Sequence, residues 1–190
     1  MTAIQILNKE SIAHKKYPLK WVTFQKTGPE GTLDKLEKEV YFRPDAVGVL
    51  PVDKIHKKLL LTRQFRLPAF LNGSDSGYLI ETCAGIIDGN ETPEQTAVRE
   101  ALEETGVEIN GLTKIAGLYS SPGGITEFVH LFIAAYDSRA KHEKGGGLKE
   151  EGEDIEVLEM GFDEAREKLN QGEFRDAKTM ILLQHFFSKG

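Results

Sequence analysis

A helix whose two ends are both marked in the sequence is the feature that most constrains this fold. Thr92 is a favourable N-cap, Pro93 suits the first helical position, and Gln95 completes a capping box. Gly106 is the residue type expected immediately after the C-terminus of a helix. Together these signals predict a helix over residues 93–105.

Acidic residues gather along one side of this predicted helix. Because a helix turns by ~100° per residue, Glu100, Glu103 and Glu104 share a face. Arg99 lies one turn before Glu103 and can pair with it. The opposite face, which we expect to pack against a sheet, carries Val98, Leu102 and Thr105. Two interpretations remain open: a solvated acidic face, or a face that holds a hard cation such as Mg²⁺.

The whole stretch from Gly85 to Val107, GIIDGNETPEQTAVREALEETGV, resembles the signature box of the Nudix hydrolases, G-x5-E-x7-R-E-U-x-E-E-x-G-U. Every fixed residue of that box is present, and Ala101 stands where a larger aliphatic residue is usual. Chance would produce such a match on the order of once in 10⁸ registers. The resemblance implies an α+β protein with the Nudix fold, a mixed β-sheet between helices, in which the box forms a loop–helix–loop.

The same resemblance implies a divalent metal cofactor, Mg²⁺, with Mn²⁺ as a substitute. The family's metal-binding positions match Ala84, through its backbone carbonyl, and Glu100, Glu103 and Glu104. Arg99 and Glu91 match residues that hold the box together, and Arg99 and Glu103 belong to the implied catalytic set. Metal ions polarise the pyrophosphate while a positioned base activates water.

A polar loop over residues 137–153 offers candidates for that base. Its glycines, residues 145–147, supply the flexibility expected of a lid, and acidic residues follow them. Alignment on the run DIEVLE matches the family's loop glutamate, a base and metal ligand, to Glu153. The loop is two residues longer than in those relatives, so Glu151 remains a rival. A solvated acidic loop is the other interpretation.

Two flanking features narrow the substrate by resemblance. Pro122, sixteen residues after Gly106, marks the ADP-ribose pyrophosphatase group of Nudix enzymes. In the run TRQFR, Arg66 matches an arginine that grips the substrate in that group, and a guanidinium suits phosphate oxygens. A surface arginine at the end of a strand is the alternative.

Further runs over about residues 37–185 resemble bacterial GDP-mannose hydrolases: NG-x-x-SG-x-LIETCAG, SPGG-x-TE and RD-x-KT. Positions that match nucleotide-sugar contacts there are Tyr17, Glu37, Lys38, Glu39, Arg66, Glu127 and Lys178. Strand packing would equally explain Tyr17, and a solvated helix Lys178. The implied reaction converts GDP-mannose and water to GMP and mannose 1-phosphate, and ADP-ribose hydrolysis is the close alternative. A non-catalytic Nudix sensor domain is the alternative of another class, although such modules usually lose box glutamates.

The remaining pattern predicts a β appendage over residues 1–43 and a main domain over 44–190. In the appendage, period-two alternation predicts short strands over residues 4–7, 20–26 and 37–42. In the main domain, VGVLPV and KKLLLTRQF read as a hairpin, YLIETCAG as a strand, and two helices close the chain at 162–170 and 177–187. About forty residues are too few to bury a core of their own, so the appendage packs either on its own main domain or on a second copy. The family resemblance favours a homodimer whose N-terminal strands complete the partner's site.

Composition limits the class of protein. The net charge of −6 gives no basic field for nucleic acid, and it disfavours an RNA-processing enzyme. The single cysteine, Cys83, excludes an internal disulfide and reads as a buried strand thiol. Because no apolar run approaches ~20 residues and the N-terminus lacks a signal-peptide pattern, we expect a cytoplasmic protein that binds neither membrane nor nucleic acid.

Overall fold

The computed structural model describes the chain except residues 1–2, 29–30, 32, 141–143, 148–153 and 190. Its contacts divide into two units, the first formed by residues 1–45 and 119–128 and the second by 46–118 and 129–190. The expected boundary at 43/44 lies near this division. However, residues 119–128 join the N-terminal unit, which no local pattern indicated.

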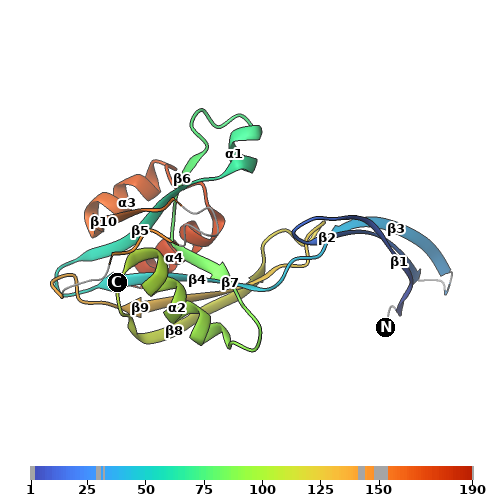
Figure 1. Cartoon of the computed structure of the whole chain (residues 1–190), viewed down its shortest axis with the longest axis horizontal. Helices are drawn as coiled ribbons and strands as arrows, with labels where there is room; N and C mark the ends of the chain where they lie inside the picture. The colour runs from blue at the N-terminus through green and yellow to red at the C-terminus, as the bar shows by residue number, and fades with distance from the viewer. Residues whose placement is uncertain (1–2, 29–30, 32, 141–143, 148–153, 190) are drawn as a thin grey trace. The chain divides into compact units, whose positions relative to one another are not determined.

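The first unit is a three-stranded antiparallel sheet of β1 (Ile4–His14), β2 (Pro18–Thr27) and β3 (Leu33–Tyr41) (Figure 1). The first strand is longer than the expected segment 4–7, and it pairs with β2 as far as His14. Register shifts between Ile6 and Asn8 and between Ser11 and Ala13 interrupt its alternation. Those irregularities hid the rest of the strand from a period-two pattern.

The second unit is built on a mixed sheet with strand order β10-β5-β4-β9-β8, in which β4 and β9 run parallel. Its strands are β4 (Ala46–Asp53), β5 (Lys58–Phe65), β6 (Tyr78–Glu81), β7 (Cys83–Ile86), β8 (Asn110–Tyr119), β9 (Phe128–Ala135) and β10 (Glu156–Gly161). Its helices are α1 (Leu67–Leu71), α2 (Pro93–Thr105), α3 (Phe162–Asn170) and α4 (Ala177–Ser188). The short α1 was not expected, because one turn shows no helical period.

Helices cover both faces of this sheet, as Figure 1 shows, which confirms the expected α+β sandwich. On one face Val47 and Val49 of β4 pack with Ala97 and Ala101 of α2. On the other face, Leu50 and its neighbours pack with α3 and α4. Because β4 is buried on both faces, its sequence is continuously apolar rather than alternating.

The packed face of α2 differs in part from the one expected: Thr105 is buried as expected, but Val98 is not. Val98 is 46% exposed, whereas the buried residues are Thr96, Ala97, Ala101, Glu104 and Thr105. Two fully buried alanines allow the helix to approach the sheet closely, and a branched side chain would hold it away. The acidic and packed faces are therefore adjacent around the helix rather than opposite.

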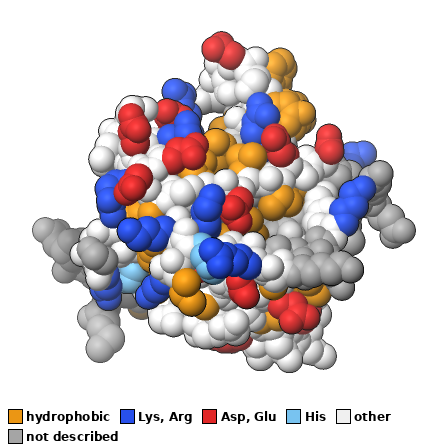
Figure 2. All heavy atoms as spheres, turned by 90° about the vertical axis from the view of Figure 1, so that its left-hand side faces the viewer, with side chains coloured by type: hydrophobic (Ala, Val, Ile, Leu, Met, Phe, Trp, Pro, Cys, Tyr) orange, Lys and Arg blue, Asp and Glu red, His pale blue; other side chains and the backbone are white. Residues whose placement is uncertain are grey.

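The part of the chain that the structure describes carries no large patch of a single charge on the face shown in Figure 2. On the face shown in Figure 2, basic and acidic side chains are interspersed rather than segregated. Among the described residues, no helix is both long and apolar enough to cross a membrane.

Candidate active site

The sheet of the second unit splits where the candidate site lies. β4 and β5 pair only at Val52–Leu59 and Asp53–Lys58. Beyond that point β7 pairs with β4 and β6 pairs with β5. The run YLIETCAG is therefore two strands with different partners, not one, and the chain crosses between them at Thr82. This crossing is fixed by bonds from the Thr82 hydroxyl to the Val49 carbonyl and from the Thr82 N–H to Thr179 Oγ1, the latter 2.8 Å long.

The expected caps of the box helix are confirmed. Thr92 Oγ1 accepts a bond from the Gln95 N–H at 3.2 Å, and Gln95 Oε1 accepts one from the Thr92 N–H at 2.8 Å. Gly106 ends the helix at φ 74°, a left-handed conformation that glycine adopts at little cost. Helix α2 runs over Pro93–Thr105, as the sequence predicted.

Arg99 holds the acidic residues of the box together. Its Nη1 donates to Glu100 Oε1 and to Glu103 Oε2, each at 2.9 Å. Its Nε donates to Glu91 Oε1 at 3.0 Å, and that bond outweighs burial and raises the pKa of Arg99. One guanidinium thus offsets the repulsion between neighbouring carboxylates, and the expected pairing of Arg99 with Glu103 is confirmed.

Glu104 is buried, contrary to the expectation that it lies on an exposed acidic face. Its side chain is 1% exposed, and Oε2 accepts a bond from the Ala84 N–H of β7 at 3.1 Å. Beside it, a Cβ at Gly85 would overlap the carboxylate of Glu100, so a larger residue there would displace that carboxylate. Helix α2 therefore lies against β7, which holds two carboxylates next to the backbone of residues 84–85.

These donors fit the implied cation. Glu100, Glu104 and the backbone of Ala84 provide oxygen atoms, the ligands that Mg²⁺ prefers. Burial of a carboxylate such as that of Glu104 is costly unless hydrogen bonds or a cation compensate its charge.

Cys83, the first residue of β7, is fully buried as expected, and burial raises the pKa of its thiol.

A second acidic group lies at the turn between β4 and β5 and consists of Asp53, His56 and Asp137. Asp53 is 3% exposed, and its Oδ1 accepts bonds from the backbone N–H groups of Ile55 and His56, both at 2.9 Å. Its Oδ2 accepts bonds from the N–H and the hydroxyl of Ser138 at 3.0 and 2.6 Å. The carboxylate is thus already saturated by hydrogen bonds, which suits a structural role better than metal binding.

The structure brings Arg66 and Lys178 together, although they lie far apart in the sequence. Arg66 binds the carboxylate of Glu81 through Nε and Nη2, at 2.6 and 2.9 Å. Lys178 Nζ lies 2.6 Å from Asp176 Oδ1 and 3.6 Å from Glu81 Oε2. Sequence reasoning missed both carboxylates. Their signal was a glutamate inside the apolar run LIETCAG and an aspartate two residues before the lysine.

The charge of Glu104 in the α2 box acts on Arg66 of this cluster. Burial lowers the pKa of Arg66, but the bond and charge of Glu81 outweigh burial, and the charges of Glu104 and Asp176 add to the rise. Arg66 therefore shares an electrostatic environment with Glu104. The site combines carboxylates suited to a metal with cations suited to a phosphate.

In the first unit, Arg43 connects two of the predicted residues. Its guanidinium carbon lies 5.1 Å from the ring centroid of Tyr17, and its Nε lies 3.0 Å from Glu127 Oε2. Arg43 had no recognisable signal in the sequence, because its partners come from distant segments.

The three consecutive candidates on β3 do not share a face. Glu37 and Glu39 lie opposite Thr23 and Trp21 of β2, whereas Lys38 lies opposite Val22. Side chains alternate along a strand, so Lys38 projects from the other side of the sheet than its two neighbours.

The glycines inside the candidate lid loop are hydrogen-bonded to the C-terminal end of the box helix. The N–H groups of Gly146 and Gly147 donate to the carbonyls of Glu104 and Glu103, at 2.9 and 3.2 Å. A Cβ at Gly145 would lie 2.5 Å from the backbone carbon of Thr105. The close approach of the loop to the helix therefore explains the glycine at this position, in addition to the flexibility that glycine provides. Glu151 and Glu153 lie outside the described residues.

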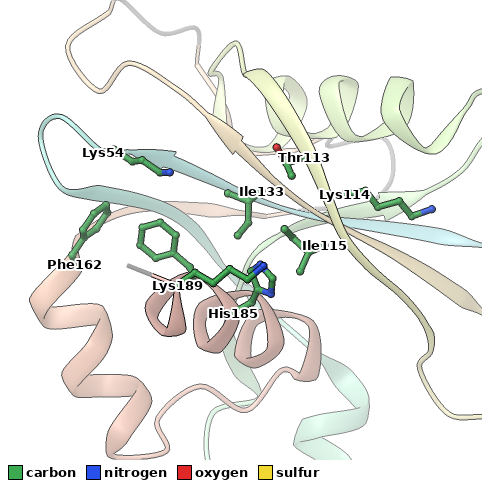
Figure 3. A pocket seen from close by; sticks show the side chains of 9 residues that line it. Lys54, Thr113, Lys114, Ile115, Ile133, Phe162, His185 and Lys189 are labelled. Carbon is green, nitrogen blue, oxygen red and sulfur yellow. The ribbon is translucent and has the colours of Figure 1, made fainter.

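A separate pocket of about 580 Å³ lies on the α4 side of the sheet (Figure 3). Ile115 and Ile133 of the strands face side chains of α4 across it, and lysines and His185 lie around it. No predicted site residue lines this pocket.

Comparison with known proteins agrees with this geometry. The NUDIX domain matches residues 42–183. GDP-mannose pyrophosphatase of Cronobacter sakazakii is 43% identical over 187 residues, which cover 98% of this chain and 96% of that protein. GDP-mannose pyrophosphatase of Escherichia coli O157:H7 is 41% identical over 182 residues, 96% of this chain and 94% of that protein. A crystal structure of an ADP compounds hydrolase has a TM-score of 0.70 at 21% identity, over 98% of this chain and 95% of its own, a likeness of fold. The chain belongs to the NUDIX domain family.

Proposed function

We propose that this protein hydrolyses the pyrophosphate bond of a nucleoside diphosphate sugar, with GDP-mannose as the first candidate. The products are GMP and mannose 1-phosphate. One observation carries the proposal: residues 81–84 join the Arg66–Glu81 pair at one end to the bond between the Ala84 N–H and Glu104 of the α2 box at the other. A pyrophosphate is a polyanion that needs both kinds of group. The names of the GDP-mannose pyrophosphatase relatives support this substrate.

In this proposal Glu100, Glu104 and the carbonyl of Ala84 hold Mg²⁺ or Mn²⁺, and Arg99 orients Glu100 and Glu103. The bound ion supplies Lewis-acid polarisation of the phosphate oxygens. Arg66 and Lys178 bind phosphate oxygens by charge-assisted hydrogen bonds. A water oxygen forms the new bond to phosphorus while the bond to the bridging oxygen breaks. A loop glutamate takes the water proton, with Glu153 as first candidate and Glu151 as second.

The first unit supplies specificity in this proposal. Tyr17, Glu127 and the pair Glu37 and Glu39 contact the nucleoside or the sugar, and Lys38 contacts it from the other face of β3 or from a partner subunit. A homodimer in which these strands complete the neighbouring site is part of the proposal. We also propose a cytoplasmic location.

ADP-ribose is the second candidate substrate, because Pro122 lies at the spacing that marks the ADP-ribose pyrophosphatase group. One experiment decides between the two. A panel of GDP-mannose, other nucleoside diphosphate sugars and ADP-ribose is incubated with Mg²⁺ in ¹⁸O-labelled water, and the monophosphate products are analysed by mass spectrometry. We expect the highest kcat/KM for GDP-mannose and no turnover with excess EDTA. Preference for ADP-ribose would replace the first candidate, and no hydrolysis of any member would refute the activity.

A further inference from the structure

We infer that Glu81 is a positioning residue for substrate binding, because its buried carboxylate orients Arg66 and Lys178 toward the phosphates. The inference rests on the proposed function and adds to it a residue for which the sequence pattern gave no role. Glu81 holds the two cations in place and takes no part in the reaction itself.

The geometry of the Arg66–Glu81 pair fixes the guanidinium plane. Glu81 is 2% exposed, so the groups that it touches must compensate its charge. Arg66 Nε and Nη2 bind its two oxygens at 2.6 and 2.9 Å, a bidentate arrangement that leaves the guanidinium little freedom to rotate. Only two of the five guanidinium N–H groups are used in this way, and the Arg66 side chain is 39% exposed. The remaining N–H groups can reach a phosphate.

Lys178 is held by the same carboxylate and by Asp176. Its Nζ lies 3.6 Å from Glu81 Oε2 and 2.6 Å from Asp176 Oδ1. Asp176 is itself fixed as the N-cap of α4, because it accepts bonds from the N–H and hydroxyl of Thr179 at 2.9 and 2.7 Å. A flexible lysine that is already ordered loses less entropy when a ligand binds.

A short segment connects these cations to the box. Glu81 ends β6, and three residues later the Ala84 N–H donates to Glu104. Residues 81–84 therefore fix Arg66 at one end and a metal-binding candidate at the other. A shift of Glu81 would move the cations relative to the carboxylates of α2, and misplacement by about 1 Å can cost a hundredfold in rate.

Glu81→Gln tests the inference, because it keeps the side-chain size and one acceptor oxygen but removes the charge and the second acceptor. Dissociation constants for GDP-mannose and ADP-ribose are measured by calorimetry in EDTA, where turnover is absent, and kcat and KM are measured with Mg²⁺. Glu156→Gln is the matched control, since it breaks an exposed arginine–glutamate pair, Arg63 of β5 with Glu156 of β10 at 3.0 Å.

We expect Glu81→Gln to weaken ligand binding and raise KM by at least about tenfold, as the loss of a charge-assisted bond predicts, with a smaller change in kcat. Glu156→Gln should stay within about twofold of the unmodified protein, as for exposed pairs in general. Because Glu81 acts mainly through Arg66, with which it makes the bidentate pair, the effects of Glu81→Gln and Arg66→Gln on binding should be less than additive in the double variant.

Unchanged binding by a folded Glu81→Gln variant, or fully additive effects with Arg66→Gln, would overturn the inference. If Glu81→Gln does not fold, Glu81→Asp replaces it, and unchanged binding by that variant would overturn it as well. A protein that binds the ligands but hydrolyses none of them refutes the proposed function and leaves this inference standing. Hydrolysis by the unmodified protein with normal binding by Glu81→Gln refutes the inference alone.

Discussion

At the scale of single residues, Glu104 combines a packing position with a proposed metal-binding position. It is 1% exposed and bonded to the Ala84 N–H. We expect Glu104→Gln to lower kcat/KM by at least about a hundredfold, because a metal ligand contributes several kcal/mol to transition-state stabilisation. Because the residue is buried, the variant should also melt at a lower temperature. Rate assays with calorimetric melting test both effects, and Glu94→Gln in the exposed first turn is the control. Activity within about tenfold of the unmodified protein would contradict the metal assignment.

A second residue-scale prediction concerns Asp53 and acid stability. Burial raises the pKa of Asp53, but the bonds from Ser138 and His56 outweigh it and hold that pKa well below its usual value of 3.8. A depressed pKa contributes stability that is present above about pH 4 and is lost as the pH falls through the folded-state value. Asp53→Asn should cost about 1–3 kcal/mol at neutral pH, because its amide nitrogen cannot accept those bonds.

The pH dependence provides the control for this prediction. The unfolding free energy, measured by urea titration from pH 7 down to pH 3, should fall more steeply below pH 4 in the unmodified protein than in Asp53→Asn. Parallel curves for the two proteins would show that the Asp53 carboxylate is not the source of the effect.

At the scale of elements, the glycines within the candidate lid loop are joined to the C-terminus of α2. The Gly146 and Gly147 N–H groups bind carbonyls of the helix, and a Cβ at Gly145 would lie 2.6 Å from the Glu104 carbonyl oxygen. We expect Gly145→Ala to separate the loop from the helix and to lower stability by about 1–3 kcal/mol. If the loop supplies the base, kcat should fall more than KM changes.

Gly161→Ala is the control for this prediction, because no atom lies within 4 Å of a Cβ at Gly161. Equal melting temperatures and kcat values for the two variants would exclude this coupling.

At the scale of the whole molecule, the first unit leaves much apolar surface uncovered within one chain. Ile6, Phe24 and Leu36 form a cross-strand row, and Ile6 and Leu36 are 50% and 41% exposed. Among the described residues of β1–β3, Val22 is the buried apolar side chain. A surface of this kind favours association with a second copy.

We therefore expect the full-length chain to be a dimer in light scattering and a variant without residues 1–43 to be monomeric or unstable. In the intact chain, Leu36→Lys should weaken the dimer and raise KM, because a charge in an apolar interface costs free energy. Lys35→Gln, on the opposite face of β3, is the matched control. A full-length protein that is monomeric at micromolar concentration with normal activity would refute the shared site.

The sequence by itself determined the box helix and the family of the chain. The bounds of α2 and of α3 were predicted to the residue, because caps and helical periods are local properties of a chain. The Nudix family and the pairing of Arg99 with Glu103 followed from the same local spacing.

Only the tertiary structure decided which segments meet. Nothing local reveals that YLIETCAG divides at Thr82 between two partner strands, or that Glu81 joins Arg66 to Lys178. Glu104 is buried because two alanines bring α2 against β7, whereas helical spacing alone suggested an exposed face. These features depend on contacts between residues distant in the chain, and local periodicity carries no information about such partners.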